Sequence, residues 1–186
     1  MTDHPHEPRG GEVWDPFGTL RGALWIGGGQ WSGKSTVART LARRYGLTAY
    51  HYDYHDARGH DDRRIARRVR LGEPPSGPDP DDVWVNTTPE EMAAATLAGF
   101  PIRFLWALDD LRGLVSGRPI IAEGWGLRPE LVAPITDSPQ RIAAGSARRL
   151  GIKVIEVDGT RDADAIVGIV ADHFRPYLPS PPSSDS

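Results

Sequence analysis

Residues 28–36 follow the apolar run at residues 23–26 and read Gly28-Gly29-Gln30-Trp31-Ser32-Gly33-Lys34-Ser35-Thr36. The spacing G-x-x-x-x-G-K-S predicts a phosphate-binding loop between a strand and a helix. Glycines let the chain curl through conformations that a Cβ would block, so that several backbone N–H groups can converge on one anion. The helix that follows presents its positive N-terminal end to the same anion. This stretch therefore predicts a loop that binds a nucleoside triphosphate.

Two side chains of the stretch have expected roles. Lys34 is expected to bridge the β- and γ-phosphates as a mobile point charge, and the Ser35 hydroxyl to bind Mg²⁺. The alternative is a glycine-rich turn that matches the spacing by chance, in a chain with 21 glycines among 186 residues. Against this alternative, Lys34 and Lys153 are the only lysines among 22 basic residues, so a rarely used residue stands where the motif requires it.

The composition sets outer limits. A length of 186 residues suits one domain with an ordinary core. The net charge of −3 does not indicate a nucleic-acid partner, and the absence of cysteine excludes disulfides, thiolate zinc sites and a cysteine nucleophile. No run approaches the ~18 apolar residues of a membrane span, and no signal peptide is evident, so we expect a cytoplasmic protein without a membrane partner.

We expect three segments along the chain: a flexible leader at residues 1–19, a folded domain at residues 20–175, and a disordered Pro/Ser-rich tail at residues 176–186. Apolar runs within the domain predict strands at residues 22–26, 47–52, 119–123 and 152–157. Apolar periodicity and helix-terminating residues predict helices at residues 34–45, 61–71, 138–150 and 162–174.

The middle of the chain should cover the substrate side. In the helix at 61–71 we expect Ile65 and Val69 to point inward, and its arginines to form a solvated face of which one or two steer an anionic substrate. Residues 72–82 are rich in proline and glycine and predict a loop. Thr88 and Glu91 form a capping box for a further helix, and a second helix should follow Pro101. Trp84 and Trp106 should pack internally.

Asp53 follows directly on the predicted strand 47–52. Ligands bind at the carboxyl ends of strands in open α/β sheets, so Asp53 is placed to accept a proton from a substrate hydroxyl or to hold Mg²⁺. One alternative is a cap for the turn at residues 53–56. Another is a zinc site built from the histidines and the aspartate nearby, which are His51, His55, His60 and Asp56.

Glu123 ends the apolar strand at residues 119–123. A carboxylate at this point can lie beside a metal held by Ser35, as a Walker-B-like element requires, or can orient the acceptor. The alternative is again a cap for the next segment.

These motifs resemble those of the P-loop small-molecule kinases, the group that includes shikimate, gluconate, adenylate and nucleoside kinases. The resemblance rests on the loop 28–36, on Asp53, on Glu123-Gly124-Trp125, and on Asp158-Gly159-Thr160, which is similar to the turn that touches adenine in that group. It implies a three-layer α/β fold with a parallel sheet in the order 2-3-1-4-5, and it implies ATP and Mg²⁺.

The resemblance also implies the site residues. We expect Lys34 and Asp53 to be catalytic. Ser35, Asp53 and Glu123 should hold the metal, and Gly159 and Thr160 should join the loop in binding the nucleotide. The acceptor should contact Asp53, Tyr54, His55, Trp125 and Arg128. The expected activity is transfer of the γ-phosphate to a hydroxyl of a metabolite, nucleoside or antibiotic.

The chain departs from the group between residues 127 and 151, where neither an apolar fourth strand nor a lid is evident. Either about 30–40 residues are missing, a size that ordinary element lengths suggest, or the last strand lies beside the first. In both cases the lid arginines that stabilise the transition state in that group are absent. The available substitutes are Arg128, Arg141, Arg148 and Arg149. The alternative function is therefore an ATP-binding regulatory or degenerate module with little turnover. A nucleotide-hydrolysing switch or motor is a third candidate, although no Asn-Lys-x-Asp sequence occurs.

Overall fold

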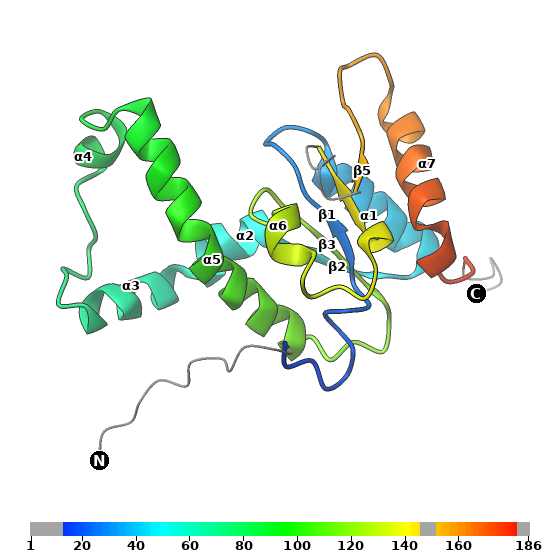
Figure 1. Ribbon diagram of the computed structural model, residues 1–186, viewed down its shortest axis with the longest axis horizontal. Coiled ribbons are helices and arrows are strands. Elements are labelled where there is room, and N and C mark those ends of the chain that lie inside the picture. Colours follow the sequence, from blue (N-terminus) through cyan, green and yellow to red (C-terminus); the bar gives the residue numbers. More distant parts are fainter. Residues whose placement is uncertain (1–12, 146–151, 182–186) are drawn as a thin grey trace.

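A computed structural model describes residues 13–145 and 152–181. All strands of this part lie in one parallel sheet with the order β2-β3-β1-β4-β5 (Figure 1). The strands are β1 (Leu24–Ile26), β2 (Thr48–His51), β3 (Ile120–Glu123), β4 (Ile142–Ala144) and β5 (Lys153–Val154). Five parallel strands in this order confirm the α/β class and the strand order that the resemblance implied.

The helices cover both faces of the sheet. They are α1 (Lys34–Tyr45), α2 (Tyr52–Tyr54), the π-helical turn η1 (His55–Gly59), α3 (Asp61–Arg70), α4 (Pro80–Trp84), α5 (Pro89–Gly113), α6 (Pro129–Val132), the 3₁₀ turn η2 (Pro139–Arg141), α7 (Ala163–Phe174) and the 3₁₀ turn η4 (Arg175–Tyr177). β1, β3 and β4 are buried along their whole length, as parallel strands covered on both faces must be.

Two apolar clusters define the layers. On one face, Phe104, Leu108 and Leu111 of α5 pack against Trp25 of β1. On the other, α1 and α7 lie side by side, with Leu41 and Phe174 fully buried between them and the sheet (Figure 1). α1 has the predicted bounds and ends at Gly46, which takes the left-handed conformation with φ of 67°.

α5 is one helix, which corrects the prediction of two helices separated at Pro101. The predicted capping box of Thr88 and Glu91 starts it, and Pro101 lies in its interior. A proline inside a helix removes one hydrogen bond and costs about 3 kcal/mol. Burial of Phe104, Leu108 and Leu111 against the sheet offsets that cost, because each large apolar side chain contributes about 1.5–3 kcal/mol when fully buried.

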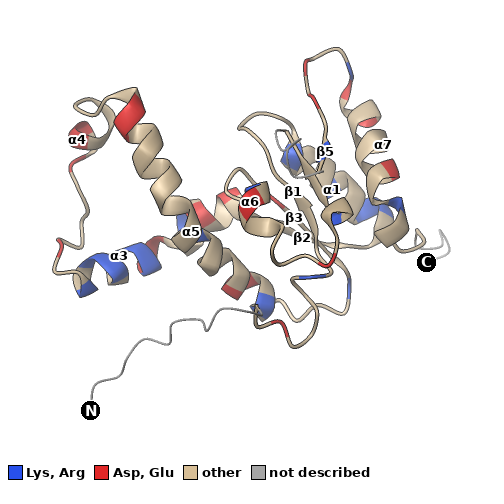
Figure 2. Cartoon of the chain, viewed as in Figure 1, with Lys and Arg blue, Asp and Glu red and all other residues tan. Residues whose placement is uncertain are grey.

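α3, α4 and the first half of α5 project from the sheet as a helical arm (Figure 1). Its charges are segregated: Lys and Arg cluster on α3, while Asp and Glu cluster on α4 and at the start of α5 (Figure 2). α3 buries no residue, so the expectation that Val69 points inward is wrong. Trp84 is 70% exposed, which corrects its predicted packing role, and α4 occupies the end of the predicted loop 72–82.

The segment before residue 145 contains the fourth strand. The predicted helix 138–150 is wrong over its described part, because Pro139–Arg141 form one 3₁₀ turn and Ile142–Ala144 form β4 between β1 and β5. Residues 146–150 of that prediction lie outside the described residues. The periodicity of three apolar residues cannot distinguish strand from helix, and pairing on both sides decides in favour of strand. The fourth strand is therefore present. Neither loss of this strand nor a last strand that lies beside the first is needed to explain the sheet, and both explanations are wrong for the strand.

The folded part extends beyond both predicted boundaries. Asp15 accepts hydrogen bonds from the backbone N–H groups of Leu20 and Arg21, so the end of the leader is held to the domain. Tyr177 donates to Ser138 Oγ, and Leu178 packs against the core, although both fall in the predicted tail. Within residues 13–145 and 152–181, no helix has the length and apolar character needed to cross a membrane.

Candidate functional site

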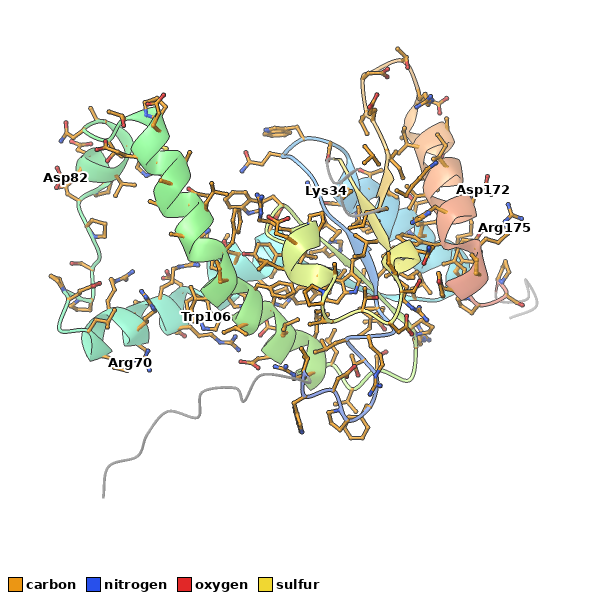
Figure 3. All side chains as sticks on the ribbon, in the orientation of Figure 1. Lys34, Arg70, Asp82, Trp106, Asp172 and Arg175 are labelled. Carbon is orange, nitrogen blue, oxygen red and sulfur yellow. The ribbon has the colours of Figure 1, made fainter. Side chains whose placement is uncertain are left out.

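The loop that joins β1 to α1 is curled back on itself. Gly28 and Gly33 have φ of 134° and 77°, and Trp31 between them has φ of 64°, a conformation that non-glycine residues rarely adopt. The Ser32 hydroxyl donates to the carbonyl of Gly29 at 2.9 Å. The Lys34 ammonium donates to the same carbonyl at 2.7 Å, and this side chain is only 7% exposed. The loop thus holds a buried cation over the carboxyl end of the sheet, across the molecule from Arg70 and Asp82 in the arm (Figure 3).

The entry of the loop is pressed against the neighbouring backbone. The Gly27 N–H donates to the Ala143 carbonyl of β4 at 2.9 Å, and a Cβ on Gly27 would lie 2.5 Å from the Leu127 carbonyl oxygen. Glycine is required here because a larger residue would push the loop away from the sheet.

Glu123 lies at the end of β3, next to His51 at the end of β2. The two residues are direct partners in the parallel register, and His51 Nδ1 is 2.7 Å from Glu123 Oε1. Glu123 is 1% exposed, and its Oε2 has no hydrogen-bond partner. A buried carboxylate oxygen without a partner is costly in a chain with no ligand, and it marks this position as a candidate metal ligand.

Asp53 lies on the first turn after β2. Its Oδ1 accepts a hydrogen bond from the Trp125 N–H at 3.0 Å. Burial raises the pKa of Asp53 above its ordinary value and the nearby Glu123 raises it further, while the Trp125 N–H and the Lys34 ammonium act in the opposite direction. Asp53 therefore shares one electrostatic environment with Lys34 and Glu123, and a perturbed pKa of this kind marks it as a candidate site residue.

Two glycines after β3 let this segment lie against Tyr52. A Cβ on Gly124 would be 2.5 Å from the Tyr52 Cβ, and a Cβ on Gly126 would be 2.2 Å from the Tyr52 ring. Sequence reasoning missed Tyr52 and His51 as supporting residues. The one available indication of a supporting role was their place at the end of the predicted strand 47–52. Alternate residues of a strand face opposite sides of the sheet, so the two side chains are expected on different faces.

Two cavities flank Lys34. The polar cavity has a volume of about 600 Å³ and is lined by Gln30, Trp31, Gly33, Lys34, Ser35, Thr36, Asp53, Asp56, Ala57 and Trp125. The apolar cavity, of about 320 Å³, is lined by Ile26, Gly27, Ser32, Lys34, Val37, Ala143, Ala144, Gly145, Ile155, Glu156, Val157, Asp158, Ile166 and Val170. Both volumes lie in the range of small-molecule sites.

The predicted turn at residues 158–160 borders the apolar cavity. Asp158 Oδ1 accepts hydrogen bonds from the Thr160 N–H at 3.0 Å and from its hydroxyl at 2.6 Å. Gly159 is in the left-handed region, with φ of 81°. Asp158 and Val157 line the cavity, whereas the sequence had indicated Gly159 and Thr160.

Three other predicted acceptor contacts lie around the polar cavity but do not line it. Tyr54 is exposed, and its ring meets the edge of the His55 ring. His55 stacks on Tyr50 with ring centroids 4.5 Å apart, and burial lowers its pKa. Arg128 pairs with the Glu130 carboxylate and lies over the Phe100 ring, which in turn meets Trp125.

The candidate arginines for the transition state are not gathered at the loop. Arg141 donates to the Gly22 carbonyl and lies 4.0 Å over the Tyr177 ring, at the amino end of the sheet. The opposite end of the sheet carries the loop, so Arg141 is too far away to serve. Arg148 and Arg149 lie outside the described residues.

The histidines do not form a metal site. His60 is buried and contacts Asp110 Oδ2 at 2.7 Å through Nε2, and His55 lies 3.4 Å from the same oxygen. His51 faces Glu123 instead. No cluster of three or more His, Cys, Asp or Glu side chains that could hold a metal ion occurs within the described ranges, so the zinc site of His51, His55, His60 and Asp56 is not formed. Asp110 was missed by sequence reasoning, because nothing local to it indicates partners 50 residues away.

No protein-family profile matches this chain, no curated protein is significantly similar to it, and no solved structure matches it significantly.

Proposed function

We propose that this chain is an ATP- and Mg²⁺-dependent phosphotransferase that moves the γ-phosphate to a hydroxyl of a small molecule. The observation that carries the proposal is the curled loop 28–36 at the carboxyl end of β1, with a buried Lys34, with Glu123 at the end of the neighbouring strand β3, and with Asp53 directly after β2, which pairs with β3. Convergent backbone N–H groups, one lysine and a helix N-terminus suit a triphosphate.

The two cavities suggest how the substrates divide. The apolar cavity fits a nucleotide base, since its lining is mostly aliphatic and it opens beside the loop. The polar cavity fits the acceptor, because it contains Asp53 and lies on the opposite side of Lys34. A γ-phosphate at Lys34 would then lie between the two.

The donors present fit Mg²⁺. The Ser35 hydroxyl and the carboxylates of Asp53 and Glu123 are hard oxygen ligands, and Glu123 Oε2 lacks a partner. These three side chains would hold the ion, directly or through water. A bound Mg²⁺ would neutralise charge on the β- and γ-phosphates.

The chain's own residues supply the remaining chemistry. Asp53 accepts the proton of the acceptor hydroxyl as its oxygen attacks the γ-phosphorus. The bond between that phosphorus and the β–γ bridging oxygen breaks, and ADP leaves. Lys34 stabilises the charge that develops on the transferred group. The raised pKa of Asp53 makes it a better proton acceptor than an ordinary carboxylate.

A second candidate is an ATP-binding regulatory module with little turnover. Ala144 ends β4 and Lys153 begins β5, so only residues 145–152 connect them. Loops longer than about 12–15 residues often serve as active-site lids, and this connection is shorter than that. Without a lid, the rate contribution of a lid arginine, about 10³–10⁵, is lost unless another group replaces it.

The first test is calorimetric titration of ATP with and without Mg²⁺. We expect Lys34→Ala to weaken binding by about 10- to 150-fold, the range for a lost hydrogen bond to a charged group. Lys153→Ala is the matched control, because Lys153 is the other lysine of the chain and is exposed. Unchanged binding in Lys34→Ala would refute the assignment of the loop.

A second test separates the two candidates. Hydroxyl compounds are screened with ATP for a mass gain of one phosphoryl group. A product that disappears in Asp53→Asn supports the kinase. Tight ATP binding without any modified acceptor supports the regulatory module.

A further inference from the structure

We infer that the acceptor is a hydroxyl-bearing ring compound that is uncharged or cationic, such as a nucleoside or a sugar, and not an anion such as a nucleotide, a sugar acid or a hydroxy acid. This inference rests on the proposed function and narrows its substrate class. It follows from the charges and the aromatic side chains that line the polar cavity.

The charges of the polar cavity are unfavourable to an anion. Asp53 and Asp56 both line it, and Lys34 is the one cation among its described lining residues. Lys34 would be engaged by the phosphates. A phosphate or carboxylate of the acceptor about 5 Å from Asp53 would be disfavoured on the order of 100-fold at an effective dielectric constant near 20.

Three arginines near the cavity are already engaged by other groups and do not reverse this balance. Asp56 Oδ1 accepts from Arg64 at 3.2 Å, and Arg103 lies 3.6 Å from Asp56 Oδ2. Arg63 donates to Asp110 and to the Trp106 carbonyl. None of these guanidinium groups lines the cavity. An anionic acceptor would have to break existing contacts to recruit one of these three arginines.

Apart from the Mg²⁺ proposed above, Asp53 has no cation partner, since it forms no ion pair with another described residue. Its Oδ1 accepts from the Trp125 N–H, which leaves Oδ2 able to accept from a hydroxyl or an ammonium group of the acceptor. The Asp56 carboxylate is held in place by Arg64 at Oδ1 and by Arg103 at Oδ2. Hydroxyl and amino groups match the available Asp53 oxygen, whereas carboxylates and phosphates are repelled by it.

The indole side chains of Trp31 and Trp125 line the polar cavity and favour an acceptor that contains a ring. Trp31 is 99% exposed, is held in a left-handed backbone conformation, and has no ring contact among the described residues. Trp125 also lines the cavity and is supported by Phe100, with ring centroids 4.9 Å apart. Aromatic side chains in a polar cavity stack on bases or on the apolar faces of sugars, with little dependence on exact identity.

The test uses matched ligand pairs that differ in charge. Binding is measured by calorimetry to the full chain loaded with a non-hydrolysable ATP analogue and Mg²⁺. The pairs are a nucleoside with its 5′-monophosphate, and a hexose with its uronic acid; an amino sugar is the cationic member. We expect an uncharged or cationic ring to bind at least tenfold more tightly than its anionic partner.

A gain-of-function variant sharpens the test. Ala57→Arg places a cation on an exposed position of the cavity lining, and it should raise affinity for the anionic member at least tenfold. Ala94→Arg makes the same change on an exposed face of α5 outside the cavity and should have no effect.

Two outcomes would overturn the inference: equal or tighter binding of the anionic member, or no binding of any uncharged or cationic ring. Both leave the proposed function intact as long as ATP binds and Lys34→Ala weakens it. Failure of ATP binding itself would instead refute the proposed function, so the two failures are distinguishable.

Discussion

The apolar and polar cavities share Lys34 but are built in different ways. The apolar cavity takes half of its lining from regular elements, namely β1, β4, α1 and α7, and the rest from the segments that join them. The polar cavity takes its lining from the loop 28–36, from the turns that follow β2 and β3, and from the start of α1. Regular elements supply repeated aliphatic side chains, whereas turns bring carboxylates and indoles together from distant parts of the chain. Under the proposed function, the apolar cavity selects the nucleotide base by shape, and the polar cavity carries the groups that perform the chemistry.

The largest expected effect tests the chemical role of the polar side. Asp53→Asn removes the proton acceptor and should lower the turnover of a phosphorylated acceptor by about 10²–10⁴, the range for general base catalysis. ATP affinity should change little by comparison. Asp109→Asn on the exposed face of α5 is the control. Turnover within a few-fold of the wild type would remove the distinction between the two cavities.

The next effect tests the aromatic lining. Trp31→Ala should weaken acceptor binding about tenfold, because stacking on an aromatic side chain is worth about 1–3 kcal/mol. Trp84→Ala removes another exposed tryptophan, which lies in the arm, and should leave acceptor binding unchanged. Calorimetry with the acceptor measures both. An equal loss in the two variants would indicate an indirect effect.

A smaller effect tests the apolar cavity. Val157→Ala removes two methyl groups from the lining, about 1 kcal/mol, so ATP should bind about fivefold less tightly. Inorganic triphosphate carries no base and should bind both proteins alike. Val85→Ala, at an exposed position of the arm, is the control. Weaker binding of triphosphate would show that the substitution acts on the loop and not on a base site.

The smallest effect concerns stability and pH. Since burial raises the pKa of Asp53 in the folded chain, the unfolded chain ionises first as the pH rises, and the charged carboxylate then lowers the free energy of unfolding. Asp53→Asn keeps an oxygen for the Trp125 N–H and removes this charge. The variant should therefore melt slightly above the wild type at pH 7, and the difference should shrink toward about pH 3, where the carboxyl is protonated in both states. A lower melting temperature at pH 7 would contradict this sign.

The regular parts around the apolar cavity could be predicted from the sequence. α1 has the predicted bounds, and α7 begins one residue after the predicted start, because Asp162 is the cap that accepts from the Ala165 N–H. Caps and apolar periodicity act between residues three or four apart, so they are readable along the chain.

The polar cavity was predicted only in part. Asp53 and Glu123 were identified from their places at strand ends, but the contribution of Asp56 and the pairing of His51 with Glu123 were not. β4 was missed because a run of three apolar residues is too short to show the periodicity of a strand or of a helix. Trp84 was expected in the interior, but it lies exposed on the arm.

The sequence by itself determined the loop 28–36, the helix after it and the strand-end carboxylates, because each depends on residues close together in the chain. Tertiary structure alone decided that β4 completes the sheet, that Arg64 and Arg103 converge on Asp56, and that Asp53 meets the Trp125 N–H. Asp53 and Trp125 are 72 positions apart. Such contacts exist only once parallel pairing of β2 with β3 brings the two strand ends together, and no local pattern of the chain encodes that distance.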